Sequence, residues 1–136
     1  MTDPLASGRL LLLAPVNAVG VPGAGLALTL ARAFPFWVEP YKARCSSARG
    51  GDLFLVRGPS SVDVLCAFTK EDWRKPSELR WIQGICLKAQ RMDLSGYAEV
   101  RVPALGCGLG GLSFERVGPI LIAGFGHGKS RFFPPQ

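Results

Sequence analysis

The stretch Pro103-Ala-Leu-Gly-Cys-Gly-Leu-Gly-Gly-Leu112 decides the fold of this chain. It follows a strand-prone apolar run at residues 98–103 and precedes a helical pattern that starts at Ser113. Four of the six residues from Gly106 to Gly111 are glycine, so the backbone can turn its N–H groups toward a phosphate or a diphosphate. Alone, such a turn is weak evidence of function. Its meaning depends on a second glycine-rich loop near the other end of the chain.

Composition indicates one globular domain over residues 1–136. Of these residues, 48% are hydrophobic and 19% are charged, which is enough apolar material for a core without disulfides or metals. The net charge is +6 and the sequence pI is about 9.6. This excess suits an anionic partner such as a nucleic acid or a nucleotide-bearing substrate, although a solvated basic surface would give the same balance.

The four cysteines lie about twenty residues apart, with no CxxC pair and no matching histidine spacing: Cys45, Cys66, Cys86 and Cys107. This spacing argues against a zinc site and favours reduced, buried thiols in a cytoplasmic protein. Residues 9–13 faintly resemble a signal peptide, but Asp3 cancels the charge and Pro15 interrupts the apolar run. We predict a buried strand there. No apolar run approaches the ~18 residues of a membrane span.

Apolar periodicity predicts alternating strands and helices. Strands are expected at residues 10–13, 52–57, 62–68, 98–103 and 130–133. Helices are expected at residues 26–34, 40–45, 79–96 and from Ser113, with Ser77 as the N-cap of the third. Such alternation implies a largely parallel sheet, in which ligands bind beyond the carboxyl ends of the strands. Both glycine loops follow strands, so both should lie at that edge.

The first glycine loop is Asn17-Ala-Val-Gly-Val-Pro-Gly-Ala-Gly25. Its glycine spacing does not match the GxGxxG of dinucleotide-binding folds, and no Gly-Lys-Ser/Thr closes it as in a P-loop. The tripeptide Gly128-Lys129-Ser130 has the P-loop letters, but it lacks the upstream glycine and the following helix. Neither common nucleotide motif therefore explains the loop.

Together, the two loops resemble those of the macrodomains, the α/β modules that bind ADP-ribose. The resemblance is nearest to the branch of antitoxins that remove ADP-ribose from DNA, and it covers almost the whole chain. The matching segments are Asn17-Ala-Val-Gly-Val-Pro-Gly-Ala-Gly-Leu-Ala-Leu28, Phe68-Thr-Lys-Glu-Asp-Trp-Arg-Lys-Pro-Ser77 and Pro103 to Leu112. It implies a three-layer α/β/α sandwich with a mixed, largely parallel sheet, whose N-terminal edge strand is missing or shortened.

The resemblance also implies roles for single residues. Asn17 would bond a hydroxyl of the distal ribose, Asp3 would bind the adenine amino group, and the two loops would enclose the diphosphate. Phe132 or Phe133 would flank the adenine, with core packing as the alternative. The full expected ADP-ribose set is Asp3, Leu5, Asn17, Gly20, Val21, Gly23, Ala24, Gly25, Thr69, Pro103, Leu105, Gly106, Cys107, Gly108, Leu109, Gly110, Gly111, Leu112 and Phe132.

Lys70 matches the lysine to which this branch assigns catalysis. Its ammonium would stabilise charge at the glycosidic bond, or its neutral amine would attack the anomeric carbon of the distal ribose. Next to it, Trp73, Arg74 and Lys75 are expected to contact nucleic acid. A solvated charge is the alternative for Lys70, packing is expected for Trp81, and a direct role is not expected for the single histidine, His127.

Three departures from the family bear on the site. Pro4 lacks the backbone N–H that relatives offer to adenine. Pro22 and Ala24 stand where relatives often carry Met and Lys. Gly110-Gly111 lacks the aspartate of a related glycohydrolase branch, which favours the DNA-directed branch.

The resemblance thus predicts a cytoplasmic ADP-ribosyl hydrolase without metal or cofactor, acting as a monomer. Its substrate would be ADP-ribosylated DNA, with thymine in single strands as the modified base. Its partner would be a cognate ADP-ribosyltransferase toxin, and it would not bind membranes. Two alternatives stay open, a non-catalytic binder of ADP-ribose and a phosphatase acting on ADP-ribose 1''-phosphate.

Overall fold

Five strands form one mixed sheet in the computed structural model, which describes residues 8–22, 24–126 and 128–135. The strand order is β2-β3-β1-β4-β5. The strands are β1 (Arg9–Asn17), β2 (Leu53–Val56), β3 (Val62–Lys70), β4 (Tyr97–Val102) and β5 (Ser130–Phe132). β1 runs parallel to β3 and β4, and β4 runs parallel to β5, whereas β2 is antiparallel to β3. The predicted mixed, largely parallel sheet is confirmed.

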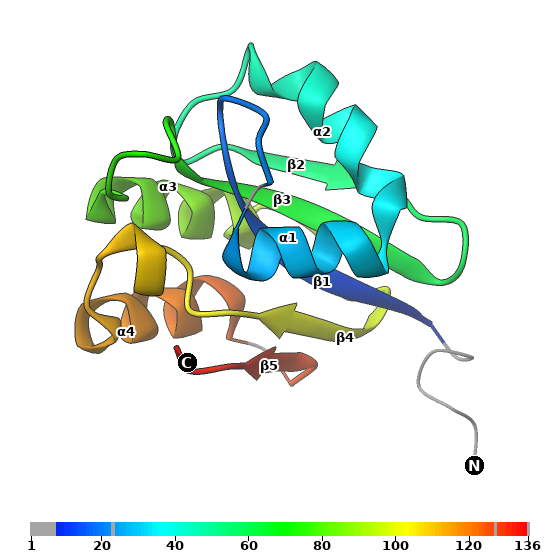
Figure 1. The fold of residues 1–136 in the computed structure, drawn as a ribbon. Coiled ribbons are helices and arrows are strands. Elements are labelled where there is room, and N and C mark those ends of the chain that lie inside the picture. Colours follow the sequence, from blue (N-terminus) through cyan, green and yellow to red (C-terminus); the bar gives the residue numbers. More distant parts are fainter. Residues whose placement is uncertain (1–7, 23, 127, 136) are drawn as a thin grey trace.

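The helices cover both faces of the sheet (Figure 1). They are α1 (Gly25–Ala33), α2 (Val38–Cys45), α3 (Leu79–Gln90) and α4 (Phe114–Phe125), with 3-10 turns at Pro35–Trp37 and Gly108–Gly110. Alternate residues of β1 enter two separate cores. Leu11 packs with α3 and α4, while Leu12 packs with α1 and α2. The central strands are therefore buried on both faces, which explains their continuous apolar sequence.

Parallel pairing brings the two glycine loops to one edge of the sheet. β1 ends at Asn17, β3 at Lys70 and β4 at Val102, and their carboxyl ends face the same way. The loop at residues 18–24 leaves β1 and the loop at residues 103–112 leaves β4 (Figure 1). The prediction that both loops lie at this edge is confirmed.

Two local predictions for α3 are wrong. Ser77 does not cap the helix, because the N-cap is Glu78 and no side chain caps it. Instead the Ser77 N–H donates to the Gly110 carbonyl at 2.9 Å, so a tertiary contact fixes this residue. The helix also ends at Gln90, before the expected end at Gly96. There the N–H groups of Arg91 and Met92 donate to the carbonyls of Lys88 and Ala89, three residues before each of them.

Several expectations concern residues outside the described ranges. They are the roles of Asp3, Leu5, Gly23 and His127, the effect of Pro4 and the shortened N-terminal edge strand. Cys45, Cys66 and Cys86 are buried free thiols and Cys107 is partly buried, as predicted. No helix in the described part of the chain is long and apolar enough to cross a membrane.

Candidate functional site

The Asn17 side chain organises the first glycine loop. Its Oδ1 atom accepts hydrogen bonds from the backbone N–H groups of Val19 and Gly20 at 3.0 Å and of Val21 at 3.3 Å. Its Nδ2 atom donates to the Val21 carbonyl at 2.8 Å. Only 7% of Asn17 is exposed, so the buried amide is satisfied by the loop that it shapes. Successive N–H groups turn inward in this first loop rather than in the second, for which it was predicted, and Asn17 is their acceptor in place of a phosphate.

The Tyr41 hydroxyl of α2 hydrogen-bonds to Asn17. It lies 2.6 Å from the Asn17 carbonyl oxygen and 3.2 Å from Oδ1. The ring is fully buried, and this burial raises the pKa of the Tyr41 phenol, which therefore serves as a neutral donor. This role could not be predicted from the residue itself, because an aromatic residue on a short helix is ordinary core material.

Gly20 could not be replaced without strain. Its φ is +91°, and a Cβ built on it would lie 2.9 Å from the Cys45 Sγ atom. The loop therefore passes directly over the C-terminal half of α2. A glycine is required by both the backbone conformation and the close approach.

The second glycine loop is a closed turn at the end of β4. The Leu112 N–H donates to the Gly106 carbonyl at 3.0 Å, and Leu105 anchors the loop in the core. Gly106, Gly108 and Gly111 have positive φ values, which accounts for three of the four glycines. The fourth, Gly110, faces the segment before α3, since its carbonyl accepts the Ser77 N–H.

Lys70 links β3 to both glycine loops. Its backbone carbonyl accepts the Ala18 N–H at 3.1 Å. Its Nζ atom donates to the carbonyls of Leu109 at 3.1 Å and Trp73 at 3.2 Å. Leu109 also approaches the first loop, because a Cβ on Gly25 would lie 3.6 Å from its Cδ1 atom. The predicted catalytic lysine thus lies between the two predicted binding loops.

The three residues expected to contact nucleic acid after Lys70 differ in their surroundings. Trp73 is 52% exposed and available for stacking. The Arg74 guanidinium donates to both carboxylate oxygens of Asp72 at 3.0 and 2.7 Å, which holds the pKa of that carboxyl below its usual range. Arg74 also lies 5.9 Å from the Trp73 ring centroid. Lys75 is exposed, and Trp81 packs over Gly50 as expected.

The other expected ligand residues occupy the same edge or the last strand. Thr69 is buried next to Lys70, and Ala24 precedes the first residue of α1 in extended backbone. Phe132 lies on β5, partly buried against the core that contains α3 and α4, while Phe133 is 42% exposed. Both roles considered for these phenylalanines, packing and adenine contact, therefore stay predictions.

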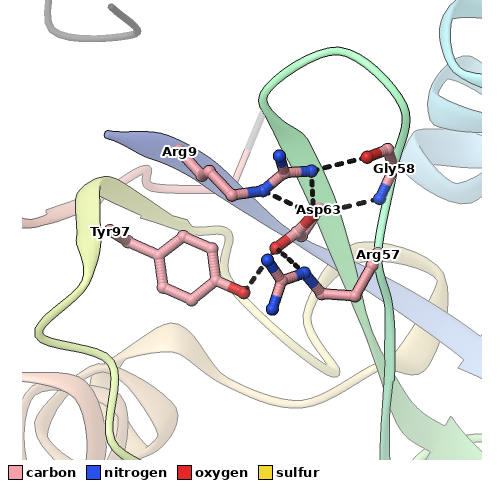
Figure 2. Close-up of polar contacts among 5 residues, drawn as sticks. All are labelled: Arg9, Arg57, Gly58, Asp63 and Tyr97. Carbon is pink, nitrogen blue, oxygen red and sulfur yellow. Dashed lines mark hydrogen bonds and ion pairs between the residues drawn. The ribbon is translucent and has the colours of Figure 1, made fainter. Parts of the chain in front are cut away.

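A cluster of charged and polar groups around the buried Asp63 was not predicted. Figure 2 shows Arg9, Arg57, Tyr97 and the Gly58 backbone converging on the Asp63 carboxylate. The shortest contact is 2.6 Å, from Arg9. Burial raises the pKa of Asp63, but the hydrogen bonds that it accepts, first of all from Arg9, outweigh burial and hold this pKa below its usual range.

Asp63 lies near the start of β3, opposite Leu11 of β1, so this cluster is at the other end of the strand from Lys70. One signal could have revealed it. A single aspartate in the apolar run 62–68 must find cationic partners if that run is buried.

No protein-family model matches the chain. The macrodomain of DarG from Mycobacterium tuberculosis superposes with a TM-score of 0.84 at 30% identity, over 100% of this chain and 95% of that one. This chain belongs to the macrodomain family.

Other comparisons agree with this assignment. The DarTG structure from Thermosipho africanus in complex with ADP-ribose matches this macrodomain with a TM-score of 0.82 at 27% identity, over 98% of the chain and 40% of that protein. Two curated relatives match in sequence. A DNA ADP-ribosyl transferase–glycohydrolase fusion protein of Thermosipho africanus is 32% identical over 78% of this chain. A DNA ADP-ribosyl glycohydrolase of Mycobacterium tuberculosis is 35% identical over 81%. This macrodomain spans a third of the length of either relative.

Proposed function

We propose that this macrodomain is an ADP-ribosyl hydrolase that removes ADP-ribose from nucleobases in single-stranded DNA, thymine foremost. The observation that carries the proposal is the position of Lys70. Its Nζ atom bridges to the second glycine loop, and its carbonyl binds the first. Relatives named as DNA ADP-ribosyl glycohydrolases support the choice of substrate.

The two loops would bind ADP-ribose and leave its distal ribose next to Lys70. The three N–H groups held by Asn17 fix the shape of the first loop, and three glycines with positive φ fix the second. Loops whose shape is fixed before binding lower the entropy cost of binding. Those members of the predicted ADP-ribose set that the structure describes lie on these loops, on β3 next to Lys70 or on β5.

The proposed reaction is hydrolysis of the bond between the anomeric carbon and the base nitrogen. Water adds to the carbon, its proton goes to the base, and free ADP-ribose and unmodified DNA result. In the resting form the Lys70 ammonium uses two of its three protons on carbonyls. We assign it to stabilising the charge that develops as the bond breaks, which is the electrostatic route of the two considered.

Trp73 would hold a base next to the modified one, because every base offers a face for stacking on an exposed indole. Arg74, bonded to Asp72, would fix the indole rather than bind phosphate. Lys75 remains available to the strand. We further propose that the domain acts as a monomer in the cytoplasm, where it would reverse the product of a DNA-modifying transferase.

One experiment separates the candidate functions. The chain is incubated with ADP-ribosylated single-stranded oligonucleotide, ADP-ribosylated protein and ADP-ribose 1''-phosphate, and the released products are measured. Release of ADP-ribose from the oligonucleotide is expected, and Lys70→Ala should abolish it while calorimetric ADP-ribose affinity persists. Binding without any release would leave a non-catalytic binder, and release of phosphate would indicate a phosphatase.

A further inference from the structure

Three exposed cations lie on α2 and in the turn that follows it. They are Lys42, Arg44 and Arg49, called here the α2 basic surface. Glu39 is the only acid in the sequence from residue 38 to residue 49. Its carboxylate lies 3.7 Å from Lys42 and is 85% exposed, so it screens the surface weakly. Two further acids bond this turn: Asp52, which accepts the Arg49 N–H and is paired with Lys88, and Glu71, which accepts the Gly50 N–H. With Lys88 included, four cations face three acids here.

This surface borders the edge of the sheet at which Lys70 lies. A Cβ on Gly20 would lie 3.8 Å from the Cγ atom of Lys42, so the stem of Lys42 runs beside the first glycine loop. At the other end, the residue after Arg49 donates its N–H to Glu71, the neighbour of Lys70, at 3.1 Å. Figure 1 shows the turn after α2 and the loop after β3 at the same end of the molecule as the first loop.

The loop after Lys70 is less suited to phosphates. The charge of Arg74 is paired with Asp72 at 2.7 Å. A hollow of about 360 Å³ beside this loop is lined by Glu71, Asp72 and Glu78, with Lys75 as its only cation. Asp72 and Glu78 are paired with Arg74 and Arg80, so Glu71 and Lys75 leave this hollow without net positive charge to hold a phosphodiester.

We propose that the sugar–phosphate backbone of the DNA strand lies along the α2 basic surface, while the modified base points to Lys70. The inference rests on the proposed function and adds the path of the strand. Lys42 would hold a phosphate beside the first glycine loop, and Arg49 would hold another beside Glu71. The glycine loops would bind the ADP-ribose moiety alone, so strand binding and ADP-ribose binding would be separable.

The test is the double variant Lys42→Gln/Arg49→Gln. Both residues are exposed, so folding should persist. On ADP-ribosylated oligonucleotide, kcat/KM should fall about tenfold, and its dependence on the logarithm of salt concentration should flatten by about 1.4 for two lost contacts to a single strand. ADP-ribose affinity and hydrolysis of ADP-ribosylated thymidine, which has no phosphodiester chain, should not change.

The matched control is Arg91→Gln/Arg101→Gln, which removes the same charge next to the ends of α3 and β4. Equal losses in the two double variants would overturn the proposal, since net charge alone would then explain them. Anisotropy of a fluorescent unmodified oligonucleotide gives a second readout that needs no turnover. A wild-type chain that binds it without hydrolysing the modified form would refute the proposed function alone. Binding that the Lys42/Arg49 variant leaves intact would refute the strand path alone.

Discussion

The Nζ atom of Lys70 donates a hydrogen bond to the Leu109 carbonyl oxygen at 3.1 Å, which ties the end of β3 to the second glycine loop. Thirty-nine residues of sequence separate the two partners. The same ammonium reaches the Trp73 carbonyl at 3.2 Å. The proposed catalytic group therefore also restrains the second glycine loop before substrate binds. An incoming distal ribose would have to share this ammonium with the loop or displace the loop from it.

Removal of this link should loosen the second loop. In Lys70→Ala, hydrogen exchange of the amides in residues 106–112 should become faster by about tenfold, because a hydrogen bond to a charged donor contributes about 1.5–3 kcal/mol. Exchange in β1 should stay as in the wild-type chain. Mass spectrometry of peptides from both segments measures the two rates. Unchanged exchange in residues 106–112 would show that the bond does not restrain the loop.

Asn17 should affect ligand binding through the shape of the first loop. Asn17→Ala leaves three backbone N–H groups without their acceptor, and we expect a loss of about 1–3 kcal/mol of unfolding free energy. ADP-ribose affinity should fall with it. Tyr41→Phe, which removes the supporting hydroxyl alone, should cost about 1 kcal/mol. Urea unfolding and calorimetric titration measure both variants; full affinity in Asn17→Ala would contradict the role assigned to the amide.

The sequence was sufficient for the fold because apolar runs and glycine loops are local signals. The buried run at residues 62–68 and the glycines at residues 106–111 are visible without any partner. Ser77 shows where such reasoning fails. A serine before a helix is a good N-cap, but here its N–H bonds the carbonyl of Gly110, a residue distant in sequence. The partners of Asp63 were equally hidden, since they depend on which segments the topology brings together. Those of Asn17 lie only two to four residues away, where an asparagine commonly shapes a turn.

Gly110 and Ser77 should show coupled effects on stability. A Cβ on Gly110 would lie 2.7 Å from the Ser77 Oγ atom and 3.2 Å from its Cβ, so Gly110→Ala should cost about 1–3 kcal/mol. Ser77 Oγ is buried and has no hydrogen-bond partner among the residues that the structure describes. Ser77→Ala should therefore be neutral or stabilising, and it should recover part of the loss in the double variant.

The control for this pair is Gly96→Ala. A Cβ at Gly96 meets no atom within 4 Å, so its effect should stay within about 0.5 kcal/mol. Chemical unfolding of all four variants gives the coupling energy. Strictly additive losses in Gly110→Ala and Ser77→Ala would mean that the two side chains do not collide.

Asp63 should dominate the acid limb of the stability curve. Its pKa is lowered in the folded chain, so it stabilises the fold above its unfolded pKa of about 3.9, and this contribution is lost as the pH falls through the lower, folded value. Asp63→Asn leaves Arg9 and Arg57 without a counter-charge and should cost about 2–4 kcal/mol at pH 7. The gap to the wild-type chain should be constant between about pH 5 and 7 and shrink below about pH 4.

Asp93→Asn is the matched control, because Asp93 bonds Ser95 at the surface and its loss should cost less than about 1 kcal/mol. Denaturant unfolding of the three chains at several pH values gives the curves. A gap for Asp63→Asn that widens on acidification would reverse the sign of the linkage. The 2.6 and 2.7 Å contacts from Arg9 and Tyr97 indicate that these residues hold the carboxylate in its charged form. A widening gap would mean that they do not.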